Sequence, residues 1–119
     1  MKLTKKTNTF ILSSSAKCLV FVKENAERGN PASVVACIDE FASTTHMMNV
    51  GDIKGKIIDD EITKKKPAIM AELGGYTGYS AVRFAHKQRK AATNKVSHYY
   101  SFEFSPVFAA RVREITRSC

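Results

Sequence analysis

Two acidic residues in the second half of the chain each close a short apolar segment. Glu72 follows residues 68–71, and Glu103 follows the aromatic residues 98–102. A carboxylate at the end of a strand can accept hydrogen bonds from both ribose hydroxyls of a nucleoside, and it repels a ligand that is phosphorylated on the ribose. Glu103 therefore predicts a ribose contact, and Glu72 predicts a nearby place for a polar or cationic group.

A glycine-rich turn follows the first of these acids. Gly74 and Gly78 have the spacing Gly-x-x-x-Gly, which differs from the Gly-x-Gly-x-x-Gly of dinucleotide-binding proteins. Glycines let a ligand approach the backbone closely, and the start of a following helix offers free N–H groups. The spacing supports pyrophosphate recognition only weakly, and an ordinary turn also explains both glycines.

Charge is distributed unevenly between the two halves of the chain. Residues 1–62 contain eight Lys or Arg and eight Asp or Glu, whereas residues 63–119 contain eleven Lys or Arg and three acids. Glu72 and Glu103 are two of those three acids. A cationic nucleoside such as S-adenosylmethionine, which carries a sulfonium and a ribose, fits this arrangement better than a nucleotide does. Purely structural roles for both acids are the alternative.

Length and composition limit the class of protein. The 119 residues, 44% hydrophobic and 25% charged, indicate one globular domain and not a disordered chain. The net charge of +8 could attract nucleic acid, but no Arg-rich run with interleaved aromatics is present, so a solvated basic surface is the simpler interpretation. Nucleic acid is therefore not expected as a partner.

The sequence also bears on where the protein resides. The apolar run at residues 10–12 is too short for a signal peptide, and no segment approaches the length of a membrane span. Cys18, Cys37 and Cys119 form no Cys-x-x-Cys pair, which is typical of a reducing compartment, and the first two are expected to be core thiols. We predict a cytoplasmic protein without a membrane partner.

Three helices are predicted over residues 10–66, after a polar segment at 1–9 that is expected to be disordered. The middle helix begins at Asn30-Pro31, where Asn can cap free N–H groups and Pro suits the first position, and it continues to about residue 42. The third helix ends before Pro67 with acids followed by lysines, and ion pairs explain these acids better than a metal site. Its expected apolar stripe is Val50, Ile53, Ile57, Ile58 and Ile62, and its expected ion pairs are Asp60–Lys64 and Glu61–Lys65.

Residues 67–119 are predicted to form a strand–helix–strand–helix unit. The apolar run from residue 68 indicates a buried strand, and residues 98–104 indicate a second, aromatic strand. Ser105-Pro106 is a typical start for the last helix. Strand–helix–strand order with this spacing implies a right-handed crossover and a parallel pair of strands.

The same residues resemble the N-terminal half of the catechol O-methyltransferases. Residues 48–55 read Met-Asn-Val-Gly-Asp-x-Lys-Gly, residues 72–83 read Glu-Leu-Gly-x-Tyr-x-Gly-Tyr-Ser-Ala-Val-Arg, and residues 25–34 and Glu103 match in order. The resemblance covers about residues 10–115. It implies an α/β fold over a single partial domain, residues 1–119: a truncated Rossmann-like methyltransferase fold in which N-terminal helices precede the parallel-stranded unit. It also implies S-adenosylmethionine and Mg²⁺ as cofactors and a catechol hydroxyl as methyl acceptor.

The resemblance implies eight cofactor-binding residues. Glu103 would bind the ribose hydroxyls, and Phe104 would lie against the adenine. Val50 and Ser80 would contact the methionine end, Tyr76 would lie near the sulfonium, and the others would line the same region. The full set is Met48, Val50, Glu72, Gly74, Tyr76, Ser80, Glu103 and Phe104.

The resemblance stops before the metal ligands of the family, two Asp and one Asn, and before its Lys general base. This chain has no Asp after Asp60 and no Asn after Asn94. We therefore predict no catalytic and no metal-binding residue, because a catechol hydroxyl must be oriented and deprotonated before it attacks. The prediction is a truncated, inactive methyltransferase. The alternative is a non-catalytic S-adenosylmethionine-binding half-domain or interaction module, with a sheet that a second chain could complete.

Overall fold

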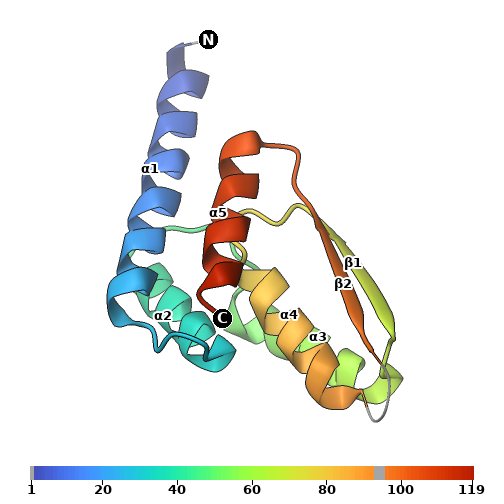
Figure 1. The fold of residues 1–119 in the computed structure, drawn as a ribbon. Coiled ribbons are helices and arrows are strands. Elements are labelled where there is room, and N and C mark those ends of the chain that lie inside the picture. The colour runs from blue at the N-terminus through green and yellow to red at the C-terminus, as the bar shows by residue number, and fades with distance from the viewer. Residues whose placement is uncertain (1, 93–95) are drawn as a thin grey trace.

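The predicted order of elements is confirmed. A computed structural model describes residues 2–92 and 96–119, with side chains from residue 14 onward, and this part of the chain contains five helices and two strands (Figure 1). They are α1 (Lys2–Asn25), α2 (Pro31–Thr44), α3 (Gly51–Lys65), β1 (Ile69–Leu73), α4 (Tyr79–Ala91), β2 (His98–Phe102) and α5 (Pro106–Arg117).

Two of the helices begin at the caps that the sequence predicts. The Asn30 side chain accepts a hydrogen bond from the Ser33 N–H at 3.2 Å, and the Ser105 hydroxyl accepts one from the Phe108 N–H at 3.3 Å. Each cap satisfies a backbone donor that has no partner within its helix. The starts of α2 and α5 are therefore fixed locally.

The first helix extends further toward the N-terminus than expected. It begins at Lys2 and not at Phe10. The side chains of residues 1–13 lie outside the described ones, and Met1 lies outside the described backbone. The expectation of a disordered segment at 1–9 thus stays a prediction.

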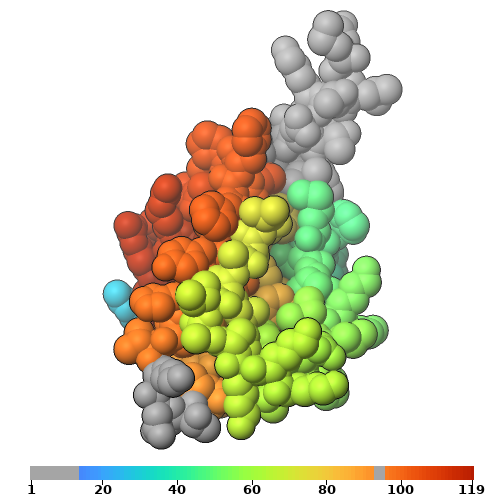
Figure 2. Space-filling model, turned by 90° about the vertical axis from the view of Figure 1, so that its right-hand side faces the viewer, coloured from blue at the N-terminus to red at the C-terminus, as the bar shows by residue number. Residues whose placement is uncertain are grey.

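The two strands form a parallel sheet, as predicted, in which Ile69 lies opposite His98 and Leu73 opposite Phe102. α4 makes the crossover between them, and the helices lie to one side of the sheet (Figure 1). Figure 2 shows the other side, where β1 and β2 form the surface. This arrangement brings the ends of both strands to the same edge as the start of α4 and of α5.

The prediction of a buried first strand is wrong. Burial alternates along β1, and Ile69 and Leu73 are 68% and 89% exposed. Successive strand residues point to opposite faces, and the helices of the described chain cover only one face of this sheet. An apolar run can signal burial on both faces, but only the tertiary structure shows which faces are covered.

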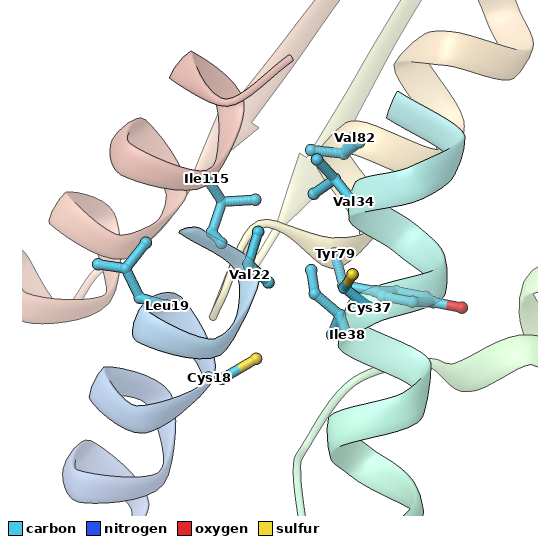
Figure 3. Close-up of a cluster of buried hydrophobic side chains, with 9 residues drawn as sticks. All are labelled: Cys18, Leu19, Val22, Val34, Cys37, Ile38, Tyr79, Val82 and Ile115. Atoms are coloured by element: carbon cyan, nitrogen blue, oxygen red, sulfur yellow. The ribbon is translucent and has the colours of Figure 1, made fainter. Parts of the chain in front are cut away.

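The core lies between four helices. Nine buried residues, contributed by α1, α2, α4 and α5, form one cluster (Figure 3). Cys18 and Cys37 belong to it, which confirms the prediction of core thiols. Each fully buried aliphatic side chain contributes roughly 1.5–3 kcal/mol. The cluster consists of Cys18, Leu19, Val22, Val34, Cys37, Ile38, Tyr79, Val82 and Ile115.

The predicted apolar stripe of α3 is only partly buried. Ile62 is buried, but Ile53 and Ile57 are exposed, because α3 packs against α4 through the face that carries Gly55. A Cβ at Gly55 would lie 2.8 Å from the Arg83 guanidinium carbon, so glycine permits this close approach. Of the two predicted ion pairs, Glu61–Lys65 forms at 3.5 Å, whereas Asp60 pairs with Lys56 instead of Lys64.

Candidate functional site

A hollow of about 360 Å³ lies where the loop before α3 meets the turn after β1. Five of the eight residues that the sequence singled out line it, although they come from two segments some 25 residues apart. The packing of α3 against α4 brings these two segments together. The lining residues are Met48, Asn49, Val50, Lys54, Gly74, Gly75, Tyr76, Tyr79 and Ser80.

The wall formed by residues 74–78 is a tight turn with an unusual backbone. Gly74 and Gly78 have φ values of 91° and 92°, a left-handed conformation that favours glycine. Tyr76 also has a positive φ of 47°, which is uncommon for a residue with a side chain. Its ring is buried edge-to-face against Phe108 with centroids 4.9 Å apart, so packing helps to hold this conformation.

Glu103 ties the turn to the start of α5. Its Oε1 accepts a hydrogen bond from the Tyr76 N–H at 2.9 Å, and its Oε2 accepts one from the Ser105 N–H at 2.8 Å. A carboxylate has about four acceptor positions, so each oxygen keeps capacity for a further donor such as a ribose hydroxyl. The side chain thus has a structural role that is compatible with the predicted ligand contact.

Phe104 lies apart from the other predicted site residues. Its side chain is fully exposed and is not among the residues that line the hollow. The contact with adenine therefore stays a prediction.

Glu72 is surrounded by hydroxyl groups of the protein. Its Oε2 accepts hydrogen bonds from Ser80 at 2.5 Å and from Tyr99 at 2.9 Å, and its Oε1 accepts one from Ser101 at 2.5 Å. Burial, followed by the negative charge of Glu72, raises the pKa of Tyr99. Glu72 is not among the residues that line the hollow, but it holds the side chain of Ser80, which is one of them.

Two helices begin at the hollow, and neither has a side-chain cap. α3 starts after Val50 and α4 starts after Gly78, each without a capping hydrogen bond from a side chain. The first N–H groups of a helix lack partners within it and carry the positive end of the helix dipole. Lys54 adds a full positive charge to the same wall. The hollow therefore suits a negatively charged group such as a carboxylate.

Sequence reasoning missed Asn49 as a wall residue. Its Oδ1 accepts a hydrogen bond from the buried Thr77 hydroxyl at 2.7 Å, which links the two segments of the wall. Its Nδ2 is buried and has no partner among the described residues. Asn49 stands inside the motif at residues 48–55, so its position in that motif was the available signal.

A charged cluster centred on Arg83 fixes α3 relative to α4. The guanidinium lies 2.8 Å from an Asp59 oxygen and 3.1 Å from Asp52, and it donates a hydrogen bond to the Tyr79 hydroxyl at 2.7 Å. Tyr79 in turn donates to Asp39 at 3.1 Å, and burial is the main cause that raises its pKa to about 12. Because Asp52 lies in the first turn of α3 and Tyr79 begins α4, the cluster sets the spacing of the two helix starts at the hollow.

Neither a metal centre nor a membrane span is found in the part of the chain that the structure describes. No group of three or more His, Cys, Asp or Glu side chains there could hold a metal ion. Mg²⁺ binds carboxylate oxygens and water, whereas the carboxylates of Glu72 and Glu103 are already hydrogen-bonded to the protein. The described residues therefore do not fit a magnesium site. No described helix is both long and apolar enough to cross a bilayer.

The parallel β1–α4–β2 unit, its glycine-rich turn and the acid after β2 define a partial Rossmann-like methyltransferase fold, as predicted. No protein-family model matches the chain. It is 38% identical over 100 residues to catechol O-methyltransferase B of Danio rerio, covering 83% of this chain and 36% of that protein. The resemblance to the catechol O-methyltransferases is thereby confirmed.

Two further relatives agree with this result. Catechol O-methyltransferase of Bos taurus is 37% identical over 99 residues, which is 82% of this chain and 35% of that protein. A probable O-methyltransferase of Mycobacterium tuberculosis is 37% identical over 101 residues, covering 84% of this chain and 41% of that protein. The chain thus spans somewhat more than a third of the length of the curated relatives it matches.

Proposed function

We propose that this chain binds S-adenosylmethionine in the hollow and forms the cofactor-binding part of an O-methyltransferase that acts on a catechol hydroxyl. One observation carries the proposal: five of the eight residues selected from the sequence line a single hollow between two uncapped helix starts. The similarity to proteins named catechol O-methyltransferase supports both the reaction and the acceptor.

The residues present fit the methionine end of this cofactor. Its carboxylate would meet the free N–H groups at the starts of α3 and α4 and the ammonium group of Lys54. The Ser80 hydroxyl donates a hydrogen bond to Glu72, so its oxygen can accept one from a ligand ammonium group. The unpartnered Nδ2 of Asn49 is a further donor at the same wall.

The ribose would lie nearer to Glu103, whose oxygens each keep an acceptor position free of the backbone. When bound, S-adenosylmethionine supplies a methyl group on a positively charged sulfur. The Tyr76 side chain is buried beside the hollow, and its hydroxyl hydrogen-bonds to the Met47 sulfur at 3.7 Å. The apolar part of this wall would exclude water from the sulfonium.

A second candidate is cofactor binding without turnover. The favouring observation is that the carboxylates next to the hollow are already engaged, Glu72 by three hydroxyls and Glu103 by two backbone N–H groups. Neither is a free general base for a hydroxyl proton. We propose that methyl transfer needs groups outside this chain, in a cytoplasmic setting that suits its free thiols.

Calorimetric titration of the purified chain with S-adenosylmethionine tests the proposal. Lys54→Ala should weaken binding about tenfold, because one charge-assisted contact worth about 1.4 kcal/mol is lost. Lys56→Ala is the matched control, since Lys56 is exposed on the same helix and pairs with Asp60 outside the hollow. Glu103→Gln, checked for folding by circular dichroism, should also bind more weakly.

If the wild type binds S-adenosylmethionine but Lys54→Ala and Lys56→Ala bind it with equal affinity, the proposed location is contradicted. If the wild type does not bind S-adenosylmethionine at all, the proposed function is contradicted. The two candidates are separated by incubating the bound chain with a catechol and measuring methylated product. Product formation supports the enzyme, and its absence despite binding supports the binding module.

A further inference from the structure

The guanidinium of Arg83 makes a set of contacts between α3 and α4 that depends on its forked shape. Its Nε and Nη2 both donate to Asp59 of α3, at 3.1 and 2.8 Å. Its Nη1 donates to Asp52 of the same helix at 3.1 Å and to the Tyr79 hydroxyl at 2.7 Å. The Arg83 side chain is only 11% exposed. A lysine ammonium is a point charge and cannot reach all of these acceptors from one position.

Two of these contacts are made to the helix starts that border the hollow. Asp52 is the second residue of α3, and Tyr79 is the first residue of α4. Tyr79 also lines the hollow, whereas Arg83 does not. The Tyr79 ring belongs to the core cluster, and its hydroxyl points out of that cluster toward its partners Arg83 and Asp39 (Figure 3). Tyr79 therefore connects the charged cluster to the wall of the hollow.

We infer that Arg83 is a positioning residue for the carboxylate of bound S-adenosylmethionine, an inference that rests on the proposed function. A carboxylate held by the free N–H groups of both helices needs the two helix starts at a fixed separation, because hydrogen bonds weaken steeply when their geometry is disturbed. Arg83 fixes this separation through Asp52 and Tyr79. It also balances the negative charge of Asp52, which would otherwise repel an anionic group at the start of α3.

The packing around Arg83 supports a role in geometry more than one in stability. A Cβ at Gly55 would lie 2.8 Å from the guanidinium carbon, so α3 approaches the charge as closely as a backbone without a side chain permits. The Oδ1 of Asp59 is buried without a partner among the described residues. Removing charges from water offsets much of the attraction between them, so a buried ion pair adds little net stability. Its directional contacts nevertheless specify one arrangement of the two helices.

Calorimetric titration of the full chain with two ligands tests the inference. Decarboxylated S-adenosylmethionine lacks only the carboxylate, and the wild type should bind the complete cofactor about 30-fold more tightly. Arg83→Lys preserves the charge and should weaken binding of the complete cofactor about tenfold, but that of the decarboxylated form less than about twofold. Tyr79→Phe keeps the ring and should weaken binding of the complete cofactor about threefold, again without affecting the decarboxylated form.

Arg117→Lys is the matched control, because Arg117 pairs with Glu114 within α5 and does not line the hollow. This variant should bind both ligands like the wild type. Circular dichroism checks the fold of each variant, and Tyr79→Phe decides the question if Arg83→Lys does not fold.

Three results would overturn the inference while the proposed function stands. They are a wild type that binds both ligands equally, an Arg83→Lys variant that loses affinity for both ligands to the same extent, and an undiminished preference for the carboxylate in Tyr79→Phe and any folded Arg83→Lys. The second result would assign Arg83 a purely structural role. A wild type that does not bind S-adenosylmethionine would instead contradict the proposed function, and the inference with it.

Discussion

Apolar residues are buried in the helical core but exposed on one face of the two-stranded sheet. In the core, Val34 and Ile38 are completely buried between α1, α2 and α4. In the sheet, Leu73 and Phe102 are equally apolar but are exposed. The difference is one of coverage, because four helices surround the core whereas the helices of the described chain pack on one face of the sheet only.

This contrast shows which part of the molecule holds the fold together. Burial of apolar surface in the helical core supplies the main stabilising free energy. The inner face of the sheet, which points toward the helices, contributes the hydrogen bonds of Glu72 to its neighbouring hydroxyls. On the outer face, which points away from the helices, apolar residues such as Ile69 and Leu73 are exposed and bury little surface on folding. Stability should thus depend strongly on core residues, moderately on the inner face and hardly at all on the outer face.

The largest expected effect comes from truncating the centre of the core. Ile38→Ala removes three buried carbon atoms and leaves a cavity, which should lower the free energy of unfolding by about 2–5 kcal/mol. Leu73→Ala, a comparable truncation on the outer face, should change it by less than about 0.5 kcal/mol. Urea denaturation followed by circular dichroism measures both. An equal decrease in the free energy of unfolding in the two variants would contradict the difference between core and sheet.

Next in size is a loss of stability at alkaline pH that originates in the core. Burial raises the pKa of Cys18 from 9.0 to about 11 and that of Tyr79 from 10.0 to about 12. Above pH 9 the unfolded chain loses these protons while the folded chain keeps them, so the folded state becomes less favoured as pH rises toward 12. Urea midpoints between pH 7 and pH 11 should fall accordingly.

Cys18→Ala tests the contribution of the Cys18 thiol to this alkaline loss. The variant is less stable at pH 7, but its further decline between pH 9 and pH 11 should be shallower than that of the wild type, because one buried thiol no longer titrates while Cys37 and the buried phenols still do. A variant whose stability declines as steeply as that of the wild type would show that the Cys18 thiol is not responsible.

The smallest effect is expected on the inner face of the sheet. Tyr99→Phe removes the 2.9 Å hydrogen bond to Glu72 and should cost about 1 kcal/mol. Tyr100→Phe is the same chemical change at the next residue, whose side chain is on the exposed outer face, and it should cost almost nothing. Comparing the two denaturation curves sharpens the distinction between the faces. Equal costs would argue against the inner cluster.

Local signals predicted most of the fold. Asn30 and Ser105 begin helices as expected, because a side-chain cap acts within three residues of the helix start. The two strands and their parallel pairing followed from an apolar run, an aromatic run and the helix between them. Five residues within the motifs at 48–55 and 72–83 that were expected to bind the cofactor lie together at the hollow, and their cofactor contact stays a prediction.

Predictions failed where two local pairings have the same spacing or where a long-range contact decided the outcome. Asp60 and Lys64 are spaced for an ion pair, yet Asp60 pairs with Lys56, since both spacings are four residues and sequence cannot choose between them. Ile53 and Ile57 fit an apolar stripe, but the Arg83 cluster binds α3 through a different face. Asn49 and Lys54 entered the site only when α3 was placed beside the turn after β1.

The sequence by itself determined the element order, the helix caps, the parallel strands and the family that the chain resembles, because each depends on neighbouring residues or on the order of motifs along the chain. Only the tertiary structure decided that Glu72 binds three hydroxyls and that the apolar face of the sheet points outward. The physical reason is that burial and side-chain hydrogen bonds require two segments in contact. A run of residues determines the chemistry of one segment, whereas the fold determines which other segment packs against it.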